Sequence, residues 1–294
     1  MEIQVENLGY TYGAGTRMAR TALTDVQFRV PTGKVLGVLG GTGSGKTTLI
    51  KNLNGLLFPT KGTVLVGGRN TLSWGPELRK RVGVVFQRPE RQLFAETVYE
   101  DVSFVLHRFS NLSQAEIRKR VEWACEVSGL DLRRIEQQNP RNLSDGEKRK
   151  TALAGVLVNE PEVLILDEPA VGLDPPSIAD LVRTIEDYVA TGSRSAVIVS
   201  HDMEQFFPLL DLLLVLHEGR RRDFGEPCEV CARLIADPDL RGFVPGIAVA
   251  VLRLREDGYP IPCDDFRVSI LAELLGEILT ANPTESGLKM ERHD

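Results

Sequence analysis

The eight residues 40–47, GGTGSGKT, constrain this chain more than any other stretch of its sequence. They fit the pattern GxxxxGK[ST] and lie between an apolar run, VLGVLG, and a segment of helical character, TTLIKNLNGLL. Glycines allow backbone N–H groups to curve around phosphate oxygens, while Lys46 brings a charge to the β and γ phosphates and Thr47 offers a hydroxyl to Mg²⁺. The stretch therefore predicts a nucleoside triphosphate site. The residues predicted to contact the nucleotide here are Gly40, Gly41, Thr42, Gly43, Ser44, Gly45, Lys46, Thr47 and Thr48.

The periodicity of the chain predicts an α/β fold. Strand-like runs at 35–40, 162–168 and 195–201 alternate with helical segments, which is typical of a parallel sheet. A mostly helical block at about 90–155 interrupts this alternation and is interpreted as an insertion into the sheet. From about Gly225 onward, prolines punctuate short helical pieces, which predicts a small C-terminal extension.

Composition narrows the class of protein further. A chain of 294 residues with 42% hydrophobic side chains suits one large or two modest globular domains. The net charge of −6 argues against a nucleic-acid-binding surface. The longest apolar run, at 209–216, is too short to cross a bilayer and contains Asp211.

A second predicted part of the nucleotide site is VLILDEP, at 163–169. Asp167 stands at the end of a buried strand, where a carboxylate has no packing role, and it is suited to hold Mg²⁺. Glu168 is the next residue, and we expect it to orient or polarise the attacking water.

Three further residues are weaker candidates by themselves. Gln87 and His201 each follow a strand of the predicted parallel sheet, at the edge where ligands gather. We expect Gln87 to reach the metal and the water, and His201 to reach the γ phosphate. Tyr12 has two interpretations that stay open at this point, stacking on a base or packing as an ordinary aromatic.

A CxxC pattern, formed by Cys228 and Cys231, raises the possibility of a metal or redox site. Zinc prefers four ligands, and the sequence has neither a second pair nor a nearby histidine. We therefore interpret the two cysteines as small buried residues on a short helix.

Taken in order, these motifs resemble the nucleotide-binding subunits of ABC transporters, over the range from Met1 to about Pro227. The resemblance identifies LSDGE (143–147) as the signature motif, VGLDP (171–175) as the D-loop and VSHD (199–202) as the switch region. It implies a P-loop NTPase with a RecA-like core, an N-terminal antiparallel β subdomain and a nucleotide-binding domain over 1–225. Residues 226–294 form the predicted C-terminal extension, with a dimerisation or accessory role.

The resemblance also implies that two such domains close head to tail on two ATP molecules. Each ATP then lies between the phosphate loop of one chain and the signature helix of the other. Ser144, Gly146 and Asp174 are the residues of this chain expected to contact the nucleotide bound to the partner.

A finer likeness lies in FQRPERQLFAETVYEDVSF (86–104), which is similar to the ATPases of energy-coupling factor transporters of the cobalt, nickel and vitamin uptake type. The opening of the chain and its stretch at 242–262 resemble the second ATPase of the heterodimeric systems. The implied protein is a peripheral subunit at the cytoplasmic face of the membrane, with a second ATPase, a transmembrane coupling protein and a substrate-capture subunit as partners. A soluble ABC-type ATPase of cluster assembly or DNA repair is the alternative.

The signature of this chain departs from the usual LSGGQ form at two positions, Asp145 and Glu147. Ser144 is suited to cap the helix, and Gly146 permits a close approach of phosphate to the backbone. Successive residues of a helix point about 100° apart, so Asp145 need not face the nucleotide that Ser144 and Gly146 face. We expect a working site; the opposite orientation, in which the carboxylate repels the γ phosphate, is the alternative.

Overall fold

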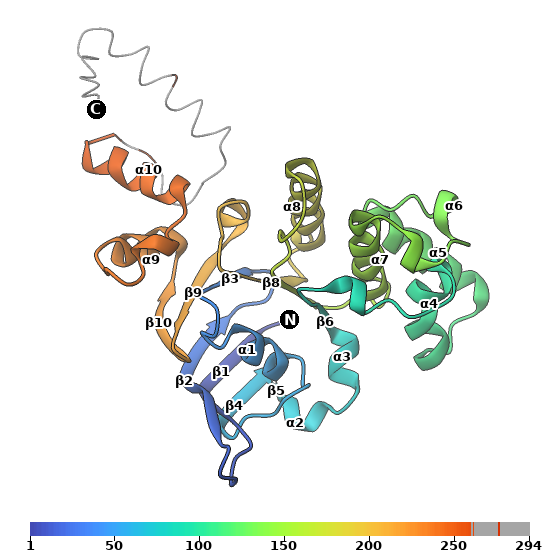
Figure 1. The fold of residues 1–294 in the computed structure, drawn as a ribbon, viewed down its shortest axis with the longest axis horizontal. Helices are drawn as coiled ribbons and strands as arrows, with labels where there is room; N and C mark the ends of the chain where they lie inside the picture. The colour runs from blue at the N-terminus through green and yellow to red at the C-terminus, as the bar shows by residue number, and fades with distance from the viewer. Residues whose placement is uncertain (260, 262–275, 277–294) are drawn as a thin grey trace.

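The computed structural model describes residues 1–259, 261 and 276 and contains two sheets (Figure 1). The smaller sheet is antiparallel, with the order β2-β1-β4-β5. Its strands are β1 (Ile3–Tyr12), β2 (Arg20–Val30), β4 (Lys61–Val66) and β5 (Arg69–Asn70). The α/β class and the antiparallel N-terminal sheet are as the resemblance implies.

The larger sheet has the order β10-β9-β3-β8-β7-β6. Its strands are β3 (Val35–Leu39), β6 (Val82–Val85), β7 (Val163–Asp167), β8 (Ser195–Ser200), β9 (Leu212–His217) and β10 (Arg220–Gly225). All pairs are parallel except β9 with β10, which are antiparallel. The two-residue connection of Glu218 and Gly219, both with positive φ, explains the exception, because so short a loop joins only antiparallel strands.

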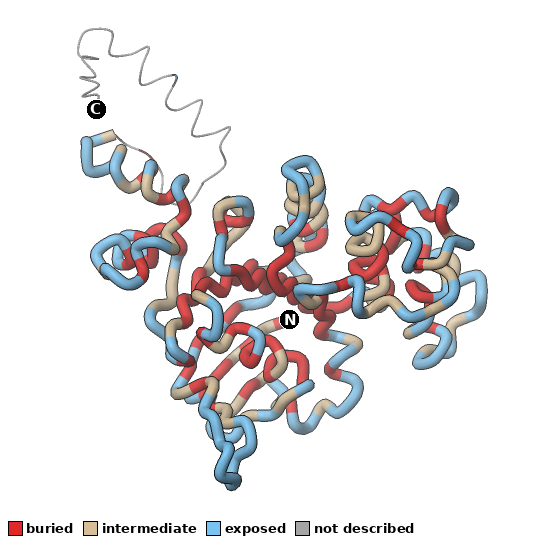
Figure 2. Tube along the Cα trace, in the orientation of Figure 1, coloured by how far each residue is buried: buried red, intermediate tan, exposed pale blue. Residues whose placement is uncertain are grey.

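Alternation of side chains along the buried strands divides the core into two clusters. Val35 and Leu39 of β3 join a cluster that includes side chains of α7, α8 and α9. Leu36 and Val38 point to the opposite face and join a second cluster with α1 and the antiparallel sheet. Figure 2 shows the buried residues gathered along these strands. Both faces of the sheet are covered, which accounts for the nearly continuous apolar sequences of its strands.

The helices fall into groups by position (Figure 1). Four helices lie together beyond the β6 edge of the sheet: α4 (Val98–Phe109), α5 (Gln114–Val127), α6 (Leu132–Ile135) and α7 (Asp145–Leu157). The helices nearer the sheets are α1 (Lys46–Leu53), α2 (Thr71–Trp74), α3 (Glu77–Arg81) and α8 (Pro175–Val189). Each of α4, α5 and α7 begins with a capping box. The start of each of these helices is therefore determined by a few residues that are close together in the sequence.

The described part of the C-terminal extension consists mainly of α9 (Pro227–Ile235), η4 (Arg241–Phe243) and α10 (Gly246–Glu256). Helix α9 contacts β9 and β10 at the edge of the larger sheet, and α10 contacts α9. Glu204 holds the start of α10, accepting hydrogen bonds from the backbone N–H of Gly246 at 2.5 Å and of Ile247 at 3.1 Å. The rest of the extension, 262–294 apart from Gly276, lies outside the described residues. The predicted domain boundaries and the accessory role of the extension remain predictions.

Cys228 and Cys231 are buried on α9, as expected from the sequence. Burial raises the pKa of the free Cys231 thiol to about 12, and Cys231 is not bonded to Cys228. Among the described residues, no cluster of histidine, cysteine or acidic side chains is arranged to hold a metal ion. No helix in the described part of the chain is long and apolar enough to cross a membrane.

Candidate nucleotide site

The phosphate loop joins the buried strand β3 to α1. Two of its glycines are required by geometry. A Cβ at Gly40 would lie 2.3 Å from the carbonyl oxygen of Leu216, and Gly45 has φ of +103° with its Cβ position 2.6 Å from the Leu23 side chain. The local sequence thus fixes a tight backbone curve at the N-terminus of a helix, which suits anion binding.

Polar groups inside this loop fit a phosphate. Lys46 is buried and donates hydrogen bonds from Nζ to the carbonyls of Gly40 at 2.6 Å and Gly41 at 3.0 Å. Burial lowers the pKa of Lys46, while Glu168 and Asp167 oppose that shift. The hydroxyl of Ser44 is also buried and has no hydrogen-bond partner among the described residues. A phosphate oxygen is a suitable acceptor for both groups.

Asp167, the last residue of β7, is buried beside the phosphate loop. Burial, and then the neighbouring Glu168, raise the pKa of Asp167 to about 6, while Lys46 and a hydrogen bond with Thr47 act in the opposite direction. Asp167 and Glu168 also line a small cavity of about 20 Å³ together with Gln87. Gln87 is exposed and lies two residues beyond the end of β6. The structure therefore places Thr47 in a hydrogen bond with Asp167, and Gln87 at the cavity that Asp167 also lines.

The carboxylate of Glu168 is held from several sides. It accepts hydrogen bonds from the Ser200 hydroxyl at 2.9 Å and the His201 backbone N–H at 3.1 Å, and its other close neighbours are His201 Nδ1 at 2.9 Å and Lys46 Nζ at 3.9 Å. Its backbone lies in the left-handed region, with φ of +50°, an unusual conformation for a residue other than glycine. The site thus fixes the position of Glu168 tightly.

His201 therefore contacts Glu168, in addition to standing at the end of β8 as predicted. Its side chain is 57% exposed, so much of the imidazole remains accessible beside the carboxylate. Ser200 was not among the predicted site residues. The only sequence signal for it is its place immediately before His201, and its bond to Glu168 depends on the pairing of β7 with β8.

Tyr12 reaches the phosphate-binding segment from β1. Its hydroxyl shares a hydrogen bond of 3.1 Å with the hydroxyl of Thr48, and its ring packs edge-on against Tyr10. Tyr12 remains partly exposed and lines a cleft of about 470 Å³ with Gly43, Lys46 and the other loop residues. The cleft has room beside the phosphate loop, and the Tyr12 ring forms part of its wall.

The signature residues are arranged differently. Ser144 is the N-cap of α7, and its hydroxyl and backbone N–H both bond the carboxylate of Glu147, which is also paired with Arg134. The Asp145 side chain is 98% exposed and lies 3.5 Å from Lys148. Each acid of the signature thus has a cationic neighbour.

Neither the signature nor the D-loop joins the phosphate loop of this chain. Gly146 lines a separate cleft of about 300 Å³ with residues of α8. Asp174 is the N-cap of α8 and accepts a hydrogen bond from the Ser177 backbone N–H at 3.1 Å. A hydrogen bond with the Ser177 side chain, and then the one from its backbone N–H, lower the pKa of the Asp174 carboxyl.

Comparison with known proteins shows the family to which the chain belongs. The sequence pattern of the ABC transporter family matches residues 23–171. A relative from Symbiobacterium thermophilum, named energy-coupling factor transporter ATP-binding protein EcfA2, is 43% identical over 267 residues, which is 90% of this chain and 92% of the relative. This chain belongs to the ABC transporter family.

Solved ABC structures share its fold. CbiO1 of Clostridium perfringens, described as part of the ABC transporter complex CbiONQ, aligns with a TM-score of 0.70 and 35% identity, over 87% of this chain and 96% of that one. A dimeric ATP-binding cassette in a post-hydrolysis state with ADP and Pi aligns with a TM-score of 0.69 and 25% identity. The alignment covers 76% of this chain and 98% of the cassette. ATP binding and ATP hydrolysis are therefore the activities of this chain.

Proposed function

We propose that this chain is an ATP-binding and ATP-hydrolysing subunit of an energy-coupling factor importer that powers the uptake of a vitamin or transition-metal ion. The observation that carries the proposal is a site in which Lys46, Asp167 and Glu168 converge, in a chain whose similar relatives bear that transporter name. The name of CbiO1 as part of a transporter complex supports the same function.

Each residue of the site has a distinct role in this proposal. The loop backbone from Gly40 to Thr48, with Lys46, binds the phosphates, and Tyr12 stacks on the base. Asp167, Thr47 and Gln87 are oxygen ligands or water-holding groups of the kind that Mg²⁺ prefers. When bound there, Mg²⁺ neutralises charge on the β and γ phosphates.

Glu168 orients the attacking water and receives its proton, while His201 and Ser200 hold the carboxylate in place. The tight hydrogen bonding of Glu168 supports this role, because an oriented carboxylate loses no freedom when the substrate binds. Ser144, Gly146 and Asp174 serve the second site, on the nucleotide of a partner ATPase. The nucleotide-binding domain then spans 1–225, with the helical subdomain at about 90–155.

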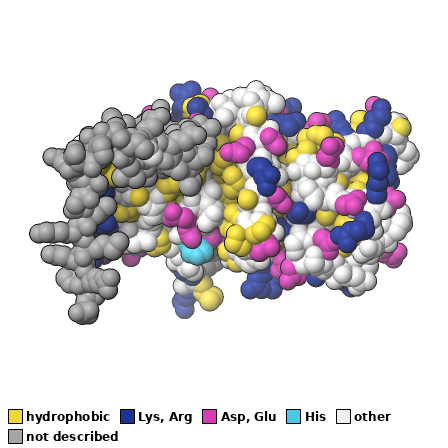
Figure 3. All heavy atoms as spheres, turned by 90° about the horizontal axis from the view of Figure 1, so that it is seen from above, with side chains coloured by type: hydrophobic (Ala, Val, Ile, Leu, Met, Phe, Trp, Pro, Cys, Tyr) yellow, Lys and Arg dark blue, Asp and Glu magenta, His cyan; other side chains and the backbone are white. Residues whose placement is uncertain are grey.

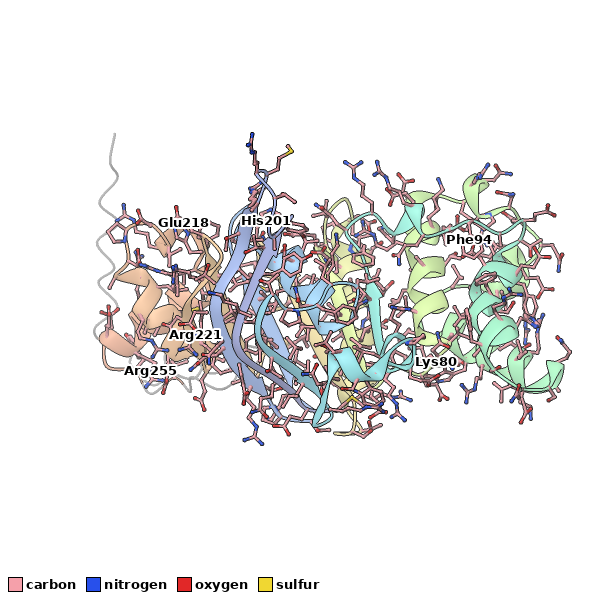
Figure 4. The ribbon with its side chains drawn as sticks, turned by 90° about the horizontal axis from the view of Figure 1, so that it is seen from below. Lys80, Phe94, His201, Glu218, Arg221 and Arg255 are labelled. Atoms are coloured by element: carbon pink, nitrogen blue, oxygen red, sulfur yellow. The ribbon has the colours of Figure 1, made fainter. Side chains whose placement is uncertain are left out.

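The surface for the membrane partner is a groove of about 560 Å³ between the sheet and the helices α4 and α7. Exposed apolar side chains line it: Leu56, Phe94, Phe104 and Phe109. Lys80 and Phe94, labelled in Figure 4, both lie toward the helical side of the molecule. Such a patch suits a protein partner, and we propose that coupling helices of a transmembrane protein occupy it at the cytoplasmic face of the membrane.

Charge argues for protein partners over nucleic acid. Figure 3 shows acidic and basic side chains interspersed over the helical side of the face in view. The net charge of the chain is −6. A nucleic-acid surface would instead show clustered lysine and arginine.

The test of the hydrolytic role is Glu168→Gln in the purified transporter complex. The amide keeps the size of the side chain but removes the base, so ATP hydrolysis should fall by about 100-fold or more while ATP binding persists. Hydrolysis at near the wild-type rate would contradict the role assigned to Glu168.

A further inference from the structure

Arg149 connects the signature helix to the backbone that follows the catalytic carboxylate. It lies on α7, five residues after Ser144. One guanidinium nitrogen donates to the carbonyl of Pro169 at 2.5 Å, and the other donates to the carbonyl of Val171 at 2.7 Å. Pro169 is the residue directly after Glu168.

The surroundings of Arg149 are unusual for a cation. The side chain is half-buried, and burial lowers its pKa, with Glu90 and then Asp145 opposing the shift. None of the salt bridges among the described residues involves Arg149, so its direct partners are the two carbonyls. Burying a charge without a counterion costs free energy, and the planar fork of arginine suits two fixed acceptors better than lysine does.

The segment that Arg149 holds is the connection between the active site and the D-loop. It turns twice on itself, with Val171 N–H donating to the carbonyl of Glu168 at 3.3 Å and Leu173 N–H donating to that of Ala170 at 3.1 Å. Arg149 also lines the small cavity shared by Gln87, Asp167 and Glu168. The two hydrogen bonds of Arg149 therefore tie α7 to Pro169 and Val171, one and three residues after Glu168.

Because an α-helix is rigid over a single turn or two, Ser144 and Arg149 move together, about 7.5 Å apart along the axis of α7. We propose that Arg149 is a positioning residue that links the signature end of α7 to the segment 169–171, so that engagement of the signature by the partner's nucleotide aligns Glu168 for hydrolysis. This inference rests on the proposed function, because it needs a partner ATPase that binds at Ser144.

The test compares three variants of the full-length chain in the detergent-purified membrane complex. Arg149→Met keeps the length and apolar stem of the side chain but removes both donors. Arg149→Lys keeps the charge with a different donor geometry. The matched control is Lys150→Met, the next cation on α7, whose Nζ donates to the carbonyl of Gly129 at 3.1 Å and lies 3.9 Å from Asp180 instead of contacting segment 169–171.

We expect Arg149→Met to lower kcat for ATP by about 10- to 100-fold, since small misplacements of a catalytic group have effects of this size. The KM for ATP should stay within about threefold of wild type, because the phosphate loop is untouched. Arg149→Lys should recover part of kcat, and Lys150→Met should hydrolyse like wild type. A kcat for Arg149→Met within about twofold of wild type would overturn the inference, as would an equal loss in Lys150→Met.

A double variant tests the link to the signature. If Ser144 acts on Glu168 through Arg149, Ser144→Ala combined with Arg149→Met should be about as slow as the slower single variant. Multiplying effects would overturn the link. If Arg149→Met fails to fold, Arg149→Lys replaces it in the double variant with Ser144→Ala. A lower kcat at an unchanged KM for Arg149→Lys then supports the inference, and an unchanged kcat overturns it. A wild-type complex without ATPase activity would instead contradict the proposed function itself.

Discussion

Removing the charge of Asp167 should stabilise the nucleotide-free protein while it abolishes efficient hydrolysis. Burial and Glu168 raise the pKa of this carboxyl from 3.8 to about 6 in the folded chain. The folded state therefore holds the proton more tightly than the unfolded chain. The stabilising effect of the neutral carboxyl is fully present below pH 3.8 and is lost as the pH rises through 6.

The size of the effect follows from the shift. One pKa unit corresponds to about 1.4 kcal/mol, so the ionised carboxylate costs the folded state about 3 kcal/mol at pH 8. The amide in Asp167→Asn never ionises, and the variant should be about 2–3 kcal/mol more stable than wild type at pH 8, after allowance for a weaker bond with Thr47. Near pH 5 the difference should shrink to roughly half.

Urea unfolding in EDTA at pH 5 and pH 8 measures both differences. A suitable control is Asp174→Asn, because the pKa of that helix-capping carboxyl is lowered in the folded chain. Removing the Asp174 charge should therefore decrease the free energy of unfolding at pH 8, where removing the Asp167 charge increases it. With MgATP present the ranking should reverse, since a bound ligand stabilises only the protein that binds it. The reasoning fails if Asp167→Asn is less stable than wild type at pH 8, or if its advantage does not depend on pH.

Three further variants test other parts of the account. Asp145→Gly should change ATP turnover by less than about fivefold, since its exposed side chain already pairs with Lys148; a rise of about tenfold or more would show that the acid obstructs the partner's site. Phe94→Ala should uncouple transport while sparing ATP binding. Ile235→Ala, at an exposed apolar residue of α9, is the control. Unchanged transport in Phe94→Ala would count against the groove as the docking site of the membrane partner. Glu204→Ala should weaken the start of α10 by roughly 0.5–2 kcal/mol and speed proteolysis at 241–256, so an unchanged cleavage pattern would show that the cap has no such role.

Local chemistry accounts for what the sequence predicts well. The phosphate loop can be predicted because glycine, lysine and threonine must follow one another at fixed spacing between a strand and a helix. The capping box of Ser144 and Glu147 can be predicted for the same reason. It explains why an acidic residue, Glu147, is favourable at the start of α7. The comparisons confirm the ABC family and the energy-coupling factor likeness that the motifs indicated.

Long-range contacts account for what the sequence does not predict. The bond from Ser200 to Glu168 requires β8 to pair with β7, and the bonds of Arg149 to the segment 169–171 require α7 to pack beside the site. The antiparallel β10 was absent from the predicted parallel sheet, although Glu218 and Gly219 form a two-residue connection between two short strands. His201 was expected at the γ phosphate, and its bond to Glu168 depends on tertiary placement.

The most direct test of the account is to purify the tagged full-length chain from detergent-solubilised membranes of its native host and to identify its companions by mass spectrometry. The account predicts a second ATPase of the same family, a polytopic coupling protein and a small integral binding subunit, in a complex that hydrolyses ATP. Recovery from the soluble fraction alone, with ribosomes, nucleic acid or cluster-assembly proteins, would contradict it.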